Sequence, residues 1–206
     1  MNYATYEITA ILTNDQGYTL ENQGTLVVYE LVIIVDSFPT AVCQDITVEL
    51  DSNGAATITA SDVDGGSSDN GGAVTLSITP NSFTCNDVGV NSVVLTVTDA
   101  AGNTATCTAN VTIQDNIVPT VVTQDATLQL DANGVATLTT NDIDNGSSDN
   151  CGVASLSLSQ TSFNCSDVGV NTVILTVVDD NGNSNTGTAT VTVEDTVNPT
   201  AVCQDV

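Results

Sequence analysis

The chain has 206 residues, of which 25 are Asp or Glu and none is Lys, Arg or His, so its formal charge is −25. This composition excludes nucleic acid and anionic membrane surfaces as direct partners, because both are bound mainly through Lys and Arg. It also argues against an enzyme, since no imidazole base, amine or guanidinium is present to support catalysis.

Residues 1–38 have a pattern of their own, in which a turn at 14–17 precedes an apolar strand near 26–35. They are predicted to be the C-terminal strands of a preceding β-sandwich domain. Such a segment leaves a strand edge open, so the alternative is that it exchanges a strand with an identical chain. No apolar run of about 18 residues and no basic signal peptide occurs, so no direct membrane insertion is expected.

From residue 39 onwards the chain repeats itself, because Pro119 opens a second copy of the segment that begins at Pro39, 80 positions earlier. The motifs SSDN and DVGVN recur at the same offset without a gap. This period predicts repeat one at 39–118, repeat two at 119–198 and the start of a third repeat at 199–206.

Short segments rich in Val, Thr, Ile and Leu alternate with turn signals inside each repeat. Residues 93–98 precede a turn at 99–103, and residues 137–140 follow a turn at 131–134. About seven such strands per repeat, without helical periodicity, are typical of an Ig-like sandwich. The predicted fold class is all-β, with tandem Ig-like antiparallel β-sandwich domains in an elongated array.

Two cysteines disappear together between the repeats. Cys43 and Cys107 lie at the two ends of repeat one, and their counterparts in repeat two are Thr123 and Gly187. This paired loss predicts a Cys43–Cys107 disulfide, which closes a loop of about 64 residues and is worth about 4 kcal/mol in the chain-entropy model. The alternative is that all the cysteines are reduced core thiols.

Cys151 and Cys165 are predicted to form a second, local bridge, because the counterpart of Cys151 in repeat one is Gly71. This pairing leaves Cys85 unpaired and gives Cys203 no partner within the chain. Disulfides persist in oxidising compartments, so the protein is expected to be extracellular or at the cell surface.

The repeats resemble the hyalin-repeat (HYR) family of Ig-like extracellular modules across residues 39–198. The resemblance rests on Cys43, the Asp99-x-x-Gly102-Asn103 turn, Cys107, Val111 to Ile113 and Asp115, recurring in part at Asp179 to Asn183 and Val191 to Asp195. Segments 146–152 and 162–171 look like those of tandem arrays in large surface adhesins of Bacteroidota. The resemblance implies adhesion and structural spacing, with no catalytic residues.

Acidic loops gather at the end where the chain enters each Ig-like sandwich. Calcium takes six to eight oxygen ligands from carboxylates, Asn side chains and main-chain carbonyls, so we hypothesise interdomain calcium sites. The alternative is ordinary turn chemistry, in which Asp and Asn bind their own backbone. The candidate ligands are Asp36, Asp62, Asp64, Asp69 and Asp99 before repeat one, and Asp115, Asp142, Asp144, Asp149 and Asp179 before repeat two.

These features predict structural stalk or spacer repeats of a secreted cell-surface adhesin or extracellular filament, stiffened by disulfides and calcium. The expected partners are neighbouring repeats of the same chain, identical chains in a filament, and a surface or cell receptor. Two alternatives belong to other classes of protein. One is a calcium-dependent ligand-binding adhesion module, and the other is a filament subunit that polymerises by strand exchange through residues 1–38.

Overall fold

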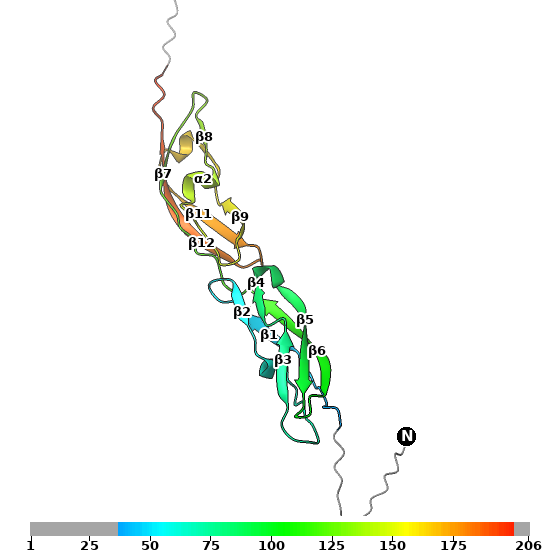
Figure 1. Ribbon diagram of the computed structural model, residues 1–206. Helices are drawn as coiled ribbons and strands as arrows, with labels where there is room; N and C mark the ends of the chain where they lie inside the picture. Colours follow the sequence, from blue (N-terminus) through cyan, green and yellow to red (C-terminus); the bar gives the residue numbers. More distant parts are fainter. Residues whose placement is uncertain (1–36, 200–206) are drawn as a thin grey trace, which may run out of the picture. The chain divides into compact units, whose positions relative to one another are not determined.

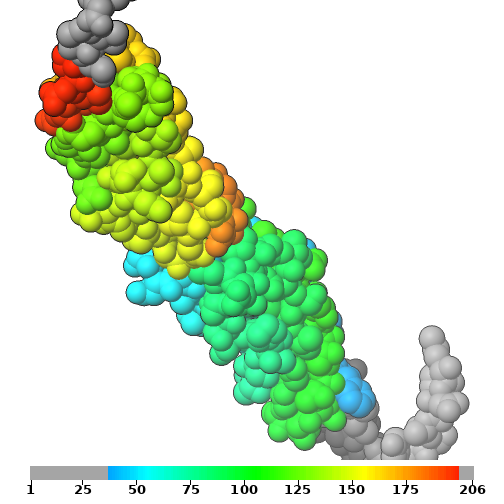
Figure 2. All heavy atoms as spheres, turned by 90° about the horizontal axis from the view of Figure 1, so that it is seen from above, coloured from blue at the N-terminus to red at the C-terminus, as the bar shows by residue number. Residues whose placement is uncertain are grey.

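A computed structural model of the protein describes residues 37–199, which belong to one compact unit. The predictions for residues 1–36 and 200–206 lie outside this range. Two groups of strands with the same element order follow one another along the chain (Figure 1), coloured blue to green and green to red in Figure 2. The all-β prediction is therefore confirmed.

The elements of repeat one are β1 (Ile46–Glu49), β2 (Ala55–Thr57), α1 (Ala60–Val63), β3 (Thr75–Thr79), β4 (Ser82–Thr84), the 3-10 turn η1 (Cys85–Asp87), β5 (Gly89–Thr98) and β6 (Thr104–Gln114). Those of repeat two are β7 (Ala126–Gln129), β8 (Val135–Thr137), α2 (Thr140–Ile143), β9 (Val153–Leu158), β10 (Ser162–Asn164), η2 (Cys165–Asp167), β11 (Gly169–Asp179) and β12 (Ser184–Glu194).

Each repeat has one four-stranded sheet and one two-stranded sheet. The orders are β1-β6-β5-β3 with β2-β4 in repeat one, and β7-β12-β11-β9 with β10-β8 in repeat two. The first strand runs parallel to the last, as β1 does to β6 and β7 to β12, and all other pairings are antiparallel. The sandwich is thus antiparallel except at one edge of its larger sheet.

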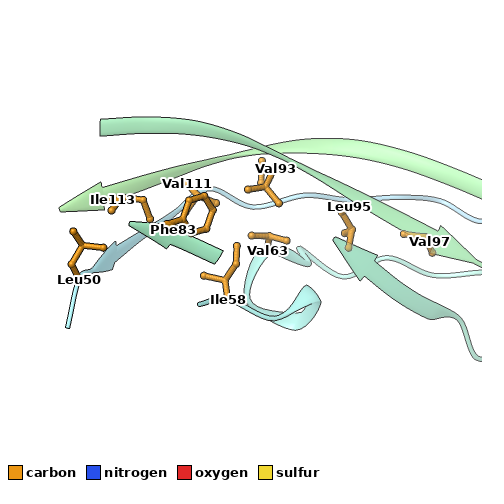
Figure 3. Close-up of a cluster of buried hydrophobic side chains, with 10 residues drawn as sticks. Leu50, Ile58, Val63, Phe83, Val93, Leu95, Val97, Val111 and Ile113 are labelled. Atoms are coloured by element: carbon orange, nitrogen blue, oxygen red, sulfur yellow. The ribbon is translucent and has the colours of Figure 1, made fainter. Parts of the chain in front are cut away.

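The core of repeat one lies between its two sheets. Val93, Leu95 and Val97 alternate with more exposed residues along β5, so every second side chain faces inward. Phe83 of β4 and Val63 of α1 pack against them from the other side (Figure 3). Repeat two has an equivalent cluster built around Phe163 and β11. Each core thus combines one phenylalanine with small aliphatic side chains, which agrees with the low aromatic content of the chain.

Each repeat has six strands among the described residues, where about seven were expected. The strand predicted for residues 137–140 ends at Thr137, and the chain turns into α2 instead. This turn forms because Thr139 caps α2 and the Asp142 carboxylate accepts a hydrogen bond from the Thr139 N–H at 2.7 Å. The local capping interaction overrides the strand preference of the threonines.

The predicted Cys43–Cys107 disulfide is present, with Cα atoms 5.8 Å apart, and it closes repeat one. In repeat two the Thr123 hydroxyl donates to the main-chain oxygen of Thr188 at 2.8 Å. The position of the missing bridge is therefore filled by a hydrogen-bonding side chain.

Candidate metal centre

Three aspartates from separate elements meet where repeat one joins repeat two. Asp115 follows β6, Asp149 lies between α2 and β9, and Asp179 ends β11. One carboxylate oxygen from each lies within 4.8 Å of the other two. Asp115 is 6% exposed and Asp179 is 2% exposed, so these charges have little access to water. The structure thus brings together three of the five acids predicted for this junction.

The turn between β11 and β12 fixes Asp179. Its Oδ1 accepts from the N–H groups of Asn181 and Asn183 at 2.9 and 2.7 Å, and its Oδ2 accepts from the Asn183 amide at 2.8 Å. Gly182 has a φ of 94°, which residues with a side chain rarely adopt. Asn183 also donates to the main-chain oxygen of Asp115 at 3.0 Å, which ties the linker to this turn.

A second turn holds Asp149. The N–H of Cys151 donates to Asp149 Oδ2 at 2.8 Å. Between these residues, the Asn150 amide donates to Asp115 Oδ1 and to the main-chain oxygen of Asp51, both at 3.2 Å. Asn150 therefore connects repeat one, the linker carboxylate and the loop that carries Asp149.

Several buried oxygens at this junction lack a hydrogen-bond donor among the described residues. They are Asp115 Oδ2, Asp149 Oδ1 and Asn150 Oδ1. A buried polar atom without a partner costs free energy, and the chain has no cationic side chain to supply one. Carboxylate and amide oxygens are the ligands that calcium takes, whereas structural zinc sites use thiolate and imidazole. The residues at the junction therefore fit calcium.

The second disulfide joins Cys85 of repeat one to Cys151 of repeat two, so the predicted Cys151–Cys165 pair is wrong. Cys151 lies near the end of β11 and Cys165 near its beginning. The 11 residues of β11 span roughly 36 Å at about 3.3 Å per residue, whereas a disulfide needs Cα atoms within about 7 Å. Cys165 is instead an exposed free thiol.

The Cys85 side of the bridge lies against the turn at residues 51–54, which is drawn in cyan and borders repeat two in Figure 2. Cys85 Sγ is 3.7 Å from the main-chain oxygen of Gly54 and 3.5 Å from that of Asn150. A Cβ at Gly54 would lie 2.5 Å from Cys85 Sγ and 2.9 Å from the Asn150 oxygen. The turn and the Asp149 loop are therefore in direct contact.

Asp142 and Asp144 do not join the carboxylate group, which corrects their assignment as metal ligands. Asp142 Oδ2 accepts from the N–H and the hydroxyl of Thr139, both at 2.7 Å, and so caps α2. Asp144 Oδ1 accepts from the Ser147 N–H at 3.0 Å. Hydrogen bonds from Thr139 and Ser147 hold the pKa of these two carboxyls below its usual value. These acids are turn and cap formers.

At the junction before repeat one, Asp36 lies outside the described residues. Asp62 caps α1 and Asp64 accepts from a serine three residues further on, as their counterparts do in repeat two. Asp69 and Asp99 each accept hydrogen bonds within their own turn. Among residues 37–199 these four form no second group of three close carboxylates, so a metal site at this junction stays a prediction.

Two residues that build the junction, Cys85 and Asn150, were not predicted as site residues. The partner of Cys85 was not predicted, although Gly71 stands at the position of Cys151 in repeat one, so the partner of Cys151 did not have to lie within its own repeat. Asn150 ends the SSDN motif of repeat two, which the sequence marked only as part of the repeat. Its contact with Asp51 could be found only by placing the two repeats together.

No protein-family model and no curated protein matches the chain. Among solved structures, it is similar to the N-terminal eight Ig domains of Down Syndrome Cell Adhesion Molecule, with a TM-score of 0.39 and 10% identity over 84% of this chain and 29% of that one. Drosophila N-cadherin EC1-4 has a TM-score of 0.40 and 10% identity, over 77% of this chain and 50% of that one. Human mucin-like protocadherin EC1-2 has a TM-score of 0.39 and 14% identity, over 77% of this chain and 98% of that one.

At these TM-scores the likeness carries no argument about what the chain binds, and the fold assignment rests on its own strands and sheets. The chain spans half or less of the first two of these structures. Within residues 37–199, no helix has the length and apolar character needed to cross a bilayer.

Proposed function

We propose that the chain is part of an extracellular spacer, in which tandem β-sandwich modules form a stiff stalk of a surface adhesin or filament and calcium binds between repeat one and repeat two. The observation that supports this proposal is the structure of the junction between the two repeats. A disulfide joins the two repeats there, beside three carboxylates that have no cation of the chain's own within reach.

The linker between the repeats is held at both ends by repeat two. Asn183 donates to the main-chain oxygen of Asp115 at 3.0 Å, and Asn185 donates to that of Pro119 at 2.9 Å. Proline further limits the backbone freedom of the linker. A hydrogen-bonded linker together with a covalent bridge resists bending, which is the property that a spacer needs.

Charge supports the calcium part of the proposal. Two carboxylates 4.8 Å apart repel by about 3.5 kcal/mol at an effective dielectric constant of about 20, and three of them are present. Turn chemistry accounts for the bonds made by both oxygens of Asp179 and by Oδ2 of Asp149. It leaves Asp115 Oδ2 and Asp149 Oδ1 without donors, and a divalent cation would satisfy both.

Two bridges among the described cysteines support an extracellular location, because the cytoplasm keeps thiols reduced. A non-enzymatic role agrees with the absence of His, Lys and Arg from the sequence. The partner that these contacts support is the neighbouring repeat of the same chain. Cell adhesion and any receptor at the far end of the stalk would depend on other parts of the adhesin.

The test is thermal unfolding of the oxidised 206-residue chain in calcium and then in EDTA. Calcium at about 100 times its Kd adds about 2.7 kcal/mol to a native state that binds it, so the midpoint should rise by several degrees. Asp115→Asn should remove most of this rise, whereas Asp142→Asn should keep it because Asp142 caps α2. A midpoint that does not respond to calcium would show that no metal binds at the junction.

A further inference from the structure

The Cys85–Cys151 disulfide and the carboxylate group share one short loop. We propose that this bridge positions Asp149 for calcium, so that calcium affinity depends on the Cys85–Cys151 bridge and not on the Cys43–Cys107 bridge. This inference rests on the proposed calcium site. It assigns to the bridge a role in metal binding in addition to joining the two repeats.

The loop is connected to the carboxylates at each of its residues. The N–H of Cys151 donates to Asp149, and the amide of Asn150 donates to Asp115. Gly152 follows with a φ of 110°, and its main-chain oxygen accepts from the N–H of Asp180, next to Asp179. A displacement of Cys151 would therefore move Asp149 relative to the other two ligands.

Repeat one determines where Cys151 lies. Its sulfur is bonded to Cys85, which follows β4, and its side chain packs against the core of repeat one rather than that of repeat two. Asp115 also belongs to the end of repeat one, directly after β6. The bridge thus fixes a ligand loop of repeat two to the same body that carries the linker carboxylate.

The corresponding loop of repeat one shows what the local sequence achieves without a bridge. Gly71 occupies the position of Cys151, and its N–H still donates to Asp69, the counterpart of Asp149, at 2.6 Å. The turn therefore does not need a cysteine. What the bridge adds is the placement of this turn against the neighbouring repeat.

Preorganisation is the physical reason for an effect on affinity. Three like charges favour an open loop when no cation is bound, and ordering that loop would cost entropy on binding. A covalent bridge restricts the loop before calcium arrives. Residues that orient metal ligands without touching the metal typically change affinity by about 10- to 100-fold. Because coupling is reciprocal, calcium must stabilise the bridge by the same factor.

The test is isothermal titration of the 206-residue chain with calcium, well below its unfolding midpoint, with Cys165→Ser and Cys203→Ser in every sample to prevent thiol exchange. Cys85→Ser/Cys151→Ser should bind calcium about tenfold or more weakly. The matched control, Cys43→Ser/Cys107→Ser, should keep its affinity within about twofold, because that bridge is remote from the ligands. Circular dichroism checks that each variant retains its β-sheet signal.

A second arm needs no cysteine removed from either bridge. An excess of a dithiol donates two electrons and two protons to a bridge, which becomes two thiols while the dithiol closes into its own disulfide. Calcium should lower the equilibrium fraction of reduced Cys85 and Cys151, measured by alkylation and peptide mass, and leave that of Cys43 and Cys107 unchanged. This arm decides the question if the control variant fails to fold.

The outcomes separate the two proposals. If the parent chain binds no calcium, the calcium site is wrong and the positioning role is overturned with it. If the parent and Cys85→Ser/Cys151→Ser bind equally well, the calcium site stands and the positioning role is wrong. If both bridges affect binding or reduction equally, the bridge acts through general stability and the positioning role is again contradicted.

Discussion

The two repeats close the same edge of their sandwiches by different means. Repeat one uses the Cys43–Cys107 bridge. In repeat two, a Cβ at Gly187 would lie 2.8 Å from Val121 Cγ1 and 3.0 Å from Thr123 Cγ2, so aliphatic atoms occupy the space of the bridge. Packing can therefore replace a disulfide within a sandwich, and this explains why both cysteines are lost together.

The other described cysteines follow a different rule. Cys85 and Cys165 occupy the same position in both repeats, each with Sγ 3.7 Å from the main-chain oxygen of a turn glycine. Cys85 bonds to Cys151 of the next repeat. Packing within one sandwich cannot replace Cys85, because Cys85 bonds to a residue of the neighbouring sandwich. The bonded cysteines therefore divide into one pair that closes a sandwich and one pair that joins two sandwiches, and Cys165 remains a free thiol.

The largest effect is expected from removing the bridge that closes repeat one. Cys43→Ala/Cys107→Ala should reduce the free energy of unfolding of repeat one by about 4 kcal/mol, because the unfolded chain regains the freedom of a 64-residue loop. Urea unfolding of the oxidised chain, followed by hydrogen exchange of β5 and β6, measures it. A loss below about 1 kcal/mol would show that packing already closes repeat one as it closes repeat two.

A smaller effect is expected from adding one methyl group to repeat two. Gly187→Ala forces a Cβ against Val121 and Thr123, so the free energy of unfolding should fall by about 1–3 kcal/mol. Gly146→Ala is the control for crowding, because nothing lies within 4 Å of its Cβ, although its φ of 89° adds strain of its own. Hydrogen exchange of β11 and β12 reports the change. Unaltered protection after Gly187→Ala would mean that the space is not filled as described.

The smallest effect is expected from the turn acids that both repeats share. Hydrogen bonds from the N–H of Val135 and from Asn133 hold the pKa of the Asp131 carboxyl below its usual value, and equivalent bonds from Ala55 and Asn53 lower the pKa of Asp51. Because the folded pKa is depressed, this stabilisation is complete above about pH 4. It is lost as the pH falls through the folded pKa.

The pH prediction is tested by comparing wild type with Asp131→Asn in metal-free urea unfolding. The difference between their midpoints should be largest above pH 4 and should shrink below it. Comparing two variants at each pH cancels the change in overall charge. A difference that stays constant down to pH 2 would contradict the role of the Asp131 carboxylate.

The sequence predicted what depends on local pattern. The alternation of Val93, Leu95 and Val97 indicated β5, and the Asp-x-x-Gly-Asn pattern indicated the turn that follows it. The Cys43–Cys107 bridge could be predicted because comparison of the repeats showed both positions changing together. In each case the residues that carry the signal contact one another within one repeat.

The sequence failed where contacts cross from one repeat to the next. The absence of a cysteine at Gly71, the counterpart of Cys151, suggested a local Cys151–Cys165 bridge, but β11 separates these two residues and Cys151 bonds to Cys85 of repeat one. Asp142 and Asp144 were grouped with the junction acids by their place in the chain. A single capping turn at Thr139 and a bond from Ser147 give them other partners. Both partners lie three residues from the acid they contact, and Thr139-x-x-Asp142 has the spacing of a capping box, so the sequence itself carried the signal that Asp142 is a cap.

The proposed stalk depends on calcium bound at the junction between the two repeats. The most direct measurement is a crystal structure of the oxidised chain grown with calcium, with terbium as the anomalous substitute. We expect one ion bonded to oxygens of Asp115, Asp149 and Asp179 at about 2.3–2.6 Å for calcium, with the Cys85–Cys151 bridge intact beside it. A junction between the two repeats that holds only water at saturating calcium would contradict this expectation.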